Sequence, residues 1–156
     1  MTRIPPTEEE RAQLKVLQAS MKEIYDSFNP FVCHIISSEE KIYFNARGWY
    51  HLQHDIHGKL RDVKPRIHKL LLVPLVIVAL KNAKQIDEHR EEMVKLKRKK
   101  RAKSELVDYW AVSAYVGKKG NVKVKVVVIK PKNAEKMIFW SVMRLGTKKA
   151  PDGELL

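Results

Sequence analysis

Three runs with a two-residue period near the C-terminal end constrain the fold of this chain most strongly. They are VDYWAVSAYV, VKVKVVVIK and MIFWSVMR, and the turn sequences GKKGN and PKNAEK separate them. Valine, isoleucine and aromatic residues favour strands, whereas Gly, Pro and Asn favour the tight connections between strands. The pattern therefore predicts three antiparallel strands in a meander.

The N-terminal region predicts an amphipathic helix. Thr7 is a suitable N-cap, and the three acidic residues that follow it suit the positive end of a helix. Apolar residues from Leu14 to Phe28 keep the spacing of three and four that places them on one face, and the helix should end near Asn29-Pro30. After it, FVCHII and KIYF predict a pair of short strands joined by a hydrophilic turn.

Further helices are expected before the meander. The pattern predicts a short helix over residues 48–57, a loop over 58–62 and a second helix from about Val63. The buried face of the short helix would consist of three apolar residues at a spacing of three and four, Trp49, Leu52 and Ile56. Pro74 should kink the second helix or start a new one, because proline has no N–H to donate.

This order of elements predicts an α+β domain, with N-terminal helices packed on one face of a small antiparallel sheet formed by the meander and one or two earlier strands. We expect an N-terminal helix over residues 1–30, a single α+β domain over 31–146 and a tail over 147–156. A charged run, EEMVKLKRKKRAK, lies within residues 89–104. Because like charges repel, this run predicts an exposed, mobile insertion.

The charge of the chain favours a polyanionic partner. The sequence has 31 Lys and Arg against 18 Asp and Glu, a formal charge of +13, so nucleic acid is the leading partner class. A basic surface kept for solubility, or for an acidic protein partner, is the alternative. The one cysteine, Cys33, excludes an intramolecular disulfide and favours a reducing compartment. The apolar run at 70–80 is shorter than the roughly 20 residues of a membrane span, so we expect a cytoplasmic protein without a membrane partner.

Histidines and cations gather in the segment GWYHLQHDIHGKLRDVKPRIHKLLLVP. The histidines are His51, His54, His57 and His68, and the cations are Lys59, Arg61, Lys64, Arg66 and Lys69. One interpretation is a metal site. On a helix, however, the first three histidines would spread over about 120°, and a closed zinc site needs further ligands that the segment hardly provides. We therefore expect neither a metal nor another cofactor.

A second interpretation is the wet face of an ordinary helix, with the histidines opposite the core. It leaves unexplained why so many cations lie at the start of the next helix, where the helix dipole disfavours them. A bound anion would relieve that cost. A phosphodiester is one such anion, and its cleavage requires an acid, a base and fixed cations, which histidine and arginine can supply.

The sequence also resembles a nuclease family. The order FNARGWYHL, KLR, PRIHKLLLVP, an insertion, a valine-rich basic strand and FWSVMR is similar to the phage- and mobile-element-associated nucleases of the barnase–EndoU–colicin–RelE-like class, over roughly residues 41–145. The resemblance implies helices before a four-stranded antiparallel sheet, with a helix histidine facing polar residues on the sheet. It identifies His51 as that histidine, Arg61 and Arg66 as arginines that face phosphate, and Ser141 as the hydroxyl of the last strand.

The strands add candidates of their own. Alternation along MIFWSVMR would place Ser141 on one face with Met137, Phe139 and Met143, either as a functional hydroxyl or bonded to a neighbouring strand. Aromatic residues that could stack on bases, or simply fill the core, are Tyr109, Trp110, Tyr115 and Trp140. The candidate nucleic-acid-binding cations are Lys59, Lys64, Lys97, Arg98, Lys100, Arg101, Lys123, Lys125 and Arg144.

Together these features predict a metal-independent, toxin-like endoribonuclease that cleaves tRNA or another translation-associated RNA through attack of the 2′-hydroxyl, leaving a 2′,3′-cyclic phosphate. The expected catalytic residues are His51, Arg61 and Ser141 around one concave site. The second choices are His54, His57, Arg66 and His68. A noncatalytic nucleic-acid-binding protein is the main alternative, and a basic protein held by an acidic antitoxin or immunity protein is another.

Overall fold

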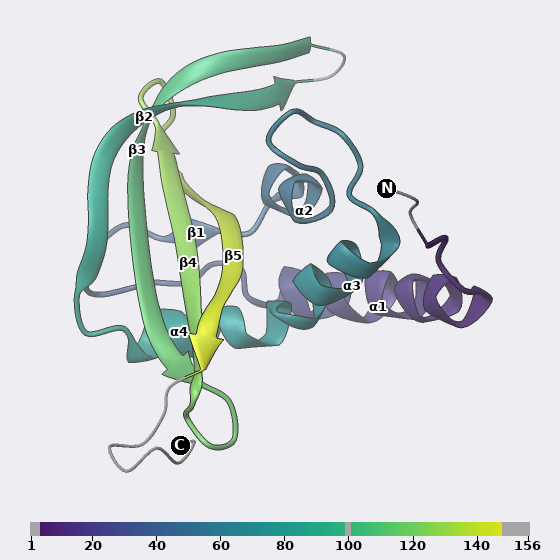
Figure 1. Cartoon of the computed structure of the whole chain (residues 1–156). Coiled ribbons are helices and arrows are strands. Elements are labelled where there is room, and N and C mark those ends of the chain that lie inside the picture. Colours follow the sequence, from purple (N-terminus) through teal and green to yellow (C-terminus); the bar gives the residue numbers. More distant parts are fainter. Residues whose placement is uncertain (1–3, 99–100, 148–156) are drawn as a thin grey trace.

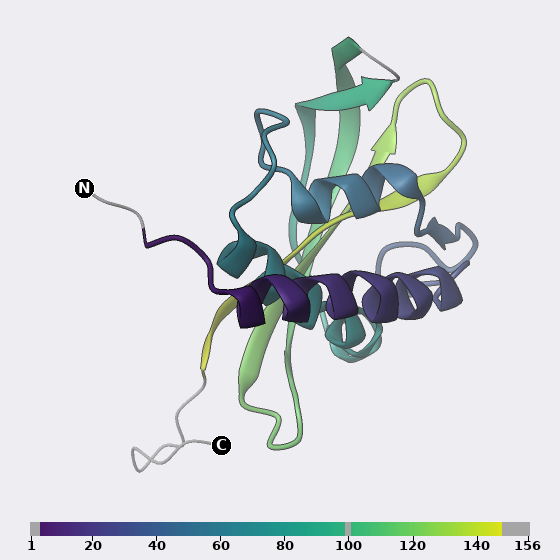
Figure 2. The same cartoon turned by 90° about the vertical axis from the view of Figure 1, so that its right-hand side faces the viewer.

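The computed structural model describes residues 4–98 and 101–147. The prediction of an α+β fold is confirmed, because helices pack against one side of a five-stranded sheet (Figures 1 and 2). The elements are, in chain order, α1 (Glu8–Ser27), β1 (Ile42–Tyr43), α2 (Ala46–Gln53), α3 (Val63–Leu71), the 3₁₀ turn η1 (Val73–Leu75), α4 (Val76–Asn82), β2 (Ile86–Arg98), β3 (Arg101–Val116), β4 (Val122–Pro131) and β5 (Met137–Thr147).

The sheet has the strand order β1-β5-β4-β3-β2. The predicted meander is present as the antiparallel strands β3, β4 and β5. The short β1 pairs with β5 in parallel, with Ile42 opposite Met137, so the sheet is mixed rather than wholly antiparallel. The strand expected in FVCHII is reduced to one bridge between Phe31 and Ile42. Beyond that bridge the carbonyl of Cys33 accepts hydrogen bonds at 3.0 Å that close a turn, so no strand continues.

The mobile insertion expected over residues 89–104 is wrong for the part of this segment that the structure describes. β2 and β3 pair through this region as one long antiparallel hairpin, as far as Arg98 opposite Arg101. The charges near its base are arranged with the two-residue period of a strand. Arg90 lies between Glu88 and Glu92 on one face and donates to both at 2.8 Å. Opposite charges that alternate on one face stabilise an exposed strand instead of repelling.

On the opposite face of this hairpin, a lysine offsets two neighbouring acids. Glu91 pairs directly with Asp108 across the strands. Lys132, which follows β4, forms ion pairs with Glu91 at 2.8 Å and Asp108 at 2.9 Å. The net charge of the run therefore did not indicate that its acidic residues form local ion pairs with lysine and arginine.

The helices follow the sequence patterns closely at their N-termini. Thr7 and Glu10 form a reciprocal capping box at the start of α1. Its buried side chains include Leu14 and Tyr25, so α1 belongs to the core of the same domain. α3 begins at Val63 as predicted, and Pro74 lies in the 3₁₀ turn that separates α3 from α4.

The short helix α2 ends at Gln53, earlier than the expected position 57. His54 is extended, and residues 55–59 form a turn. Leu52 is buried and Trp49 packs against the core, but Ile56 lies beyond the helix and is 71% exposed. The expectation that Ile56 completes the buried face of this helix is therefore wrong. The predicted tail over 147–156 lies outside the described residues except for Thr147.

Candidate functional site

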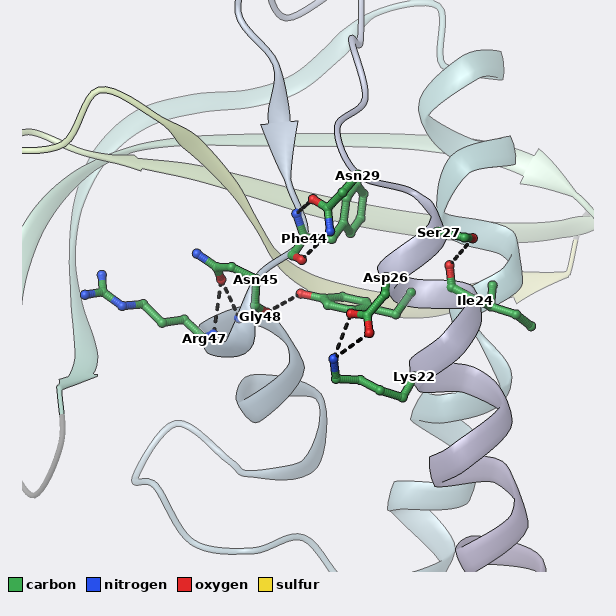
Figure 3. A network of polar contacts seen from close by, with 10 residues as sticks. Lys22, Ile24, Asp26, Ser27, Asn29, Phe44, Asn45, Arg47 and Gly48 are labelled. Carbon is green, nitrogen blue, oxygen red and sulfur yellow. Dashed lines mark hydrogen bonds and ion pairs between the residues drawn. The ribbon is translucent and has the colours of Figure 1, made fainter.

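The position of α2 is set by contacts to α1 and to β5. The buried hydroxyl of Tyr25 donates to the carbonyl of Asn45 at 2.7 Å, and the Asn45 side chain accepts from the backbone N–H groups of Arg47 and Gly48 (Figure 3). A Cβ atom on Gly48 would lie 2.5 Å from the carbonyl oxygen of Phe139. Only glycine lets the helix approach β5 this closely, so α2 is held in one position across the strand.

A bulge in β5 determines which residues face the site. Val127 pairs with Ser141 and Val128 pairs with Phe139, so Trp140 is an extra residue between them. Phe139 therefore points into the main core, while Ser141 lies on the opposite face with Val127. The expectation that Ser141 and Phe139 share a face is wrong, because strict alternation assumes an unbroken ladder.

The bulge and α2 border a pocket of about 630 Å³. The β2–β3 hairpin bends over toward α2 (Figure 1). Residues along its middle, from Arg90 to Lys95 on β2 and Tyr109 on β3, supply another wall of the pocket. The predicted site residues in its lining are His51, His57 and Ser141. Its aromatic lining consists of Tyr50, Tyr109 and Trp140, and its charged lining of Arg47, Asp55, Arg90, Glu92 and Lys95. His51 and Ser141 thus meet in one concave site despite their distance in sequence.

His51 is held against the bulge. Its ring stacks on Trp140 with centroids 4.3 Å apart and an interplanar angle of 13°. Burial, together with the smaller effects of the nearby charges of Arg61 and Lys69, lowers the pKa of His51 to about 4. At neutral pH this imidazole is uncharged and can accept a proton.

Two cations, Arg61 and Lys69, lie beside His51 but outside the pocket lining, so the prediction that Arg61 shares one concave site with His51 and Ser141 is not confirmed. The Arg61 guanidinium donates to the His51 carbonyl at 3.4 Å, and its buried Nε has no hydrogen-bond partner among the described residues. Lys69 donates to the carbonyl of Val142, next to Ser141, at 2.5 Å. Burial and the charge of Arg61 lower the pKa of Lys69 to about 8. The cations are close enough to repel one another, and an anion between them would remove that cost.

His57 enters the pocket from a tightly bonded turn. The carboxylate of Asp55 accepts from the backbone N–H groups of His57 at 2.9 Å and of Lys59 at 3.0 Å. Gly58 has a φ of +80°, which glycine adopts without strain, and the Tyr50 hydroxyl donates to its carbonyl at 3.2 Å. The exposed His57 side chain is therefore carried by an ordered backbone.

Other candidates on these helices lie outside the pocket lining. His54 stacks on Tyr50 with centroids 3.7 Å apart, and its Nδ1 lies 2.9 Å from the Tyr50 carbonyl. Arg66 donates to Gln53 at 2.9 Å, and Lys64 forms an ion pair with Glu10 at 3.7 Å. Lys59 and His68 are exposed to solvent.

Three of the predicted binding cations on the strands, Lys123, Lys125 and Arg144, do not line this pocket either. Lys123 and Lys125 share a face, as predicted, but Lys125 pairs with Glu88 at 3.6 Å and Lys123 lies over the ring of Tyr115 at 5.7 Å. Arg144 is exposed on β5. The hairpin residues Lys97, Arg98 and Arg101 have strand backbones, and Lys100 lies outside the described residues.

Arg47 and Arg90 were not among the predicted site residues, but both lie in the pocket wall. Arg90 stacks over Tyr109 at 4.1 Å while its donors bind two glutamates. The alternation of acidic and basic residues in DEHREE was the available signal for Arg90. Trp110 stacks with His89 and packs on the other core, away from this pocket.

No protein-family model, curated protein or solved structure matches the chain. Within the described residues, no three His, Cys, Asp or Glu side chains gather closely enough to hold a metal ion. In the same part of the chain, none of the helices has the length and apolarity that crossing a membrane requires. The site must therefore be interpreted from its own geometry.

Proposed function

We propose that this protein is an endoribonuclease that cleaves RNA without a metal ion, at the pocket between α2 and the bulge of β5. The observation that carries the proposal is the meeting of His51 and Ser141 in one pocket. A neutral imidazole, a hydroxyl and adjacent cations are the groups that attack by a 2′-hydroxyl requires.

In the proposed reaction, His51 removes the proton from the 2′-hydroxyl as its oxygen forms a bond to phosphorus. The bond from phosphorus to the 5′-oxygen breaks, and His57 donates a proton to that leaving oxygen. The products are a 2′,3′-cyclic phosphate and a 5′-hydroxyl. Arg61 and the Ser141 hydroxyl stabilise the nonbridging oxygens as negative charge develops on them.

The low pKa of His51 makes it a weak base in the free protein. Burial is the main cause of the low pKa, but the charges of Arg61 and Lys69 also contribute. A bound phosphate offsets those charges and raises the pKa of His51. The imidazole thus becomes a stronger base when substrate is present.

RNA in the cytoplasm is the proposed substrate, and tRNA or another translation-associated RNA is the class that the family resemblance implies. The formal charge of +13 supports a polyanionic substrate. An acidic antitoxin or immunity protein that covers the same cations is the proposed regulatory partner.

The proposal is tested by incubating the protein with RNA in excess EDTA and identifying the new termini. We expect a 2′,3′-cyclic phosphate. His51→Ala should lower the cleavage rate about 10³-fold, while the affinity for a noncleavable 2′-O-methyl RNA stays within about twofold, since cations supply most of the binding.

His34→Ala is the matched control, because His34 is an exposed histidine distant from the pocket lining. It should cleave at the wild-type rate. Full activity in the His51 variant would contradict the proposed base. Binding of RNA without any cleavage by the wild-type protein would instead support the noncatalytic alternative.

A further inference from the structure

A second pocket, of about 420 Å³, adjoins the first along the start of α2. Arg47 lines both pockets, so the two share a wall. The second pocket is formed where β1 enters α2 and where the β4–β5 turn passes, with Tyr43, Asn45, Glu135, Lys136 and Ile138 in its lining. The two hollows thus lie on either side of one arginine.

The backbone of Arg47 is held by a hydrogen bond, whereas its guanidinium is available to bind a ligand. The Asn45 side chain accepts from its N–H at 3.1 Å, and the side chain extends away from that network (Figure 3). Among the described residues, no group forms a hydrogen bond or an ion pair with its guanidinium. A cation in the first turn of a helix opposes the helix dipole. An anionic ligand at this position would offset that cost.

Aromatic rings line both pockets, and each already has one side chain against a face: His54 on Tyr50, Arg90 on Tyr109, His51 on Trp140 and Lys136 on Tyr43. Tyr50, Tyr109 and Trp140 line the first, and Tyr43 lines the second. The ammonium of Lys136 lies 4.7 Å from the centre of the Tyr43 ring. Aromatic rings beside a line of cations are the usual platform for unpaired bases, which stack without regard to sequence.

We propose that the two pockets are adjacent nucleotide subsites of a groove for single-stranded RNA, with Arg47 binding the phosphate that joins the two nucleotides. This inference rests on the proposed function and names the substrate class of that same site. One base stacks in the first pocket and the next over Tyr43. In the second pocket the charges of Glu135 and Lys136 offset one another, so the phosphate binds at Arg47 instead.

This arrangement selects unpaired RNA. Two neighbouring bases must separate to enter hollows on opposite sides of Arg47, which a duplex does not allow without unstacking. Loops and single-stranded ends therefore bind, and continuous double helices do not.

The test measures binding of noncleavable 2′-O-methyl oligonucleotides of one, two and three residues by fluorescence anisotropy. For the wild-type protein, we expect the dinucleotide to bind roughly tenfold more tightly than the mononucleotide, because one phosphate and one stacked base are added. Arg47→Gln and Tyr43→Ala should each remove most of this increment and lower the affinity for the mononucleotide by a smaller factor.

Tyr43→Leu guards against misfolding, because Tyr43 also packs beside the smaller core. It keeps apolar bulk without the ring and should lose the same increment. Arg11→Gln, at an exposed position of α1, is the matched control for charge and should keep it. An unchanged increment in both Arg47→Gln and Tyr43→Leu overturns the inference, as does equal binding of mono- and dinucleotide by the wild-type protein.

These measurements distinguish a failure of the proposed groove from a failure of the proposed reaction. Wild-type protein that shows the increment but leaves RNA intact would support the groove and contradict the proposed reaction. Wild-type protein that cleaves RNA without the increment would support the reaction and contradict the groove.

Discussion

The two faces of β5 differ sharply over three consecutive residues. On one face Phe139 is fully buried, with its ring 5.3 Å from Phe44 and 5.8 Å from Tyr25. On the other, Trp140 and Ser141 border an open pocket with charged walls. The bulge at Trp140 separates the two environments. One inserted residue therefore lets the same strand complete a core and line a candidate active site.

The electrostatics of the two faces differ in the same way. The core around Phe139 is apolar, apart from polar groups such as the Tyr25 hydroxyl that have partners. Beside the pocket, His51, Arg61 and Lys69 all have pKa values lowered by burial. One face of β5 packs into an apolar core. The other face lies beside a histidine and two cations that are available to bind a ligand.

The largest expected effects come from substitutions on the two faces of β5, which should change stability and cleavage rate differently. Phe139→Ala should reduce the free energy of unfolding by about 3–5 kcal/mol, because it leaves a cavity among packed rings. Ser141→Ala should change it by less than about 1 kcal/mol and lower the cleavage rate roughly 10²-fold, because one donor to the developing charge is lost. Urea unfolding and initial cleavage rates measure both quantities.

Ser141→Thr is a useful companion because it retains a hydroxyl. Partial recovery of the cleavage rate would tie the effect to the donor. If Ser141→Ala instead destabilised the fold as strongly as Phe139→Ala, the contrast between the two faces would be lost.

An intermediate effect is expected from pH. The folded pKa of His51 is about 4, lowered mainly by burial, and the ordinary value in an unfolded chain is about 6.5. Above pH 6.5 the imidazole is neutral in both states. As the pH falls from about 6.5 to about 4, the unfolded chain binds the proton first, and the folded state loses about 3 kcal/mol of stability from this group.

Urea unfolding of the wild-type protein and of His51→Gln between pH 7 and pH 4 measures this contribution. The variant should lose less stability over this window, since its side chain does not titrate. Identical pH profiles would show that His51 is not held in its neutral form. A titration by NMR with inorganic phosphate should also show the pKa of His51 rising.

The smallest effect is expected at the exposed rim. Lys59 is exposed beside the turn that carries His57. Lys59→Gln should reduce the slope of log affinity for RNA against log salt by about 1 and leave stability unchanged. Lys15→Gln, at an exposed position of α1, is the matched control. An equal loss of slope in both variants would mean that RNA binds through cations over the whole surface rather than through those near the pocket.

The sequence by itself determined the elements whose signals are local. Thr7 and the acids after it cap α1, the start of α3 follows Asp62, and the turn GKKGN joins two strands of the meander. These patterns depend on neighbours a few residues apart, so they can be recognised along the chain. The histidine His51 and the hydroxyl Ser141 could also be selected as candidates, on chemistry and on family resemblance.

Only the tertiary structure decided how these pieces meet. A strand partner turned the charged run after His89 into a hairpin, and an unequal ladder with β4 produced the bulge at Trp140. The position of Arg47 between two pockets became visible only when β1, α2 and β5 came together around it. The physical reason is that strand pairing and burial are set by residues distant in sequence. A one-residue offset between paired strands changes which face a side chain occupies without changing the sequence pattern itself.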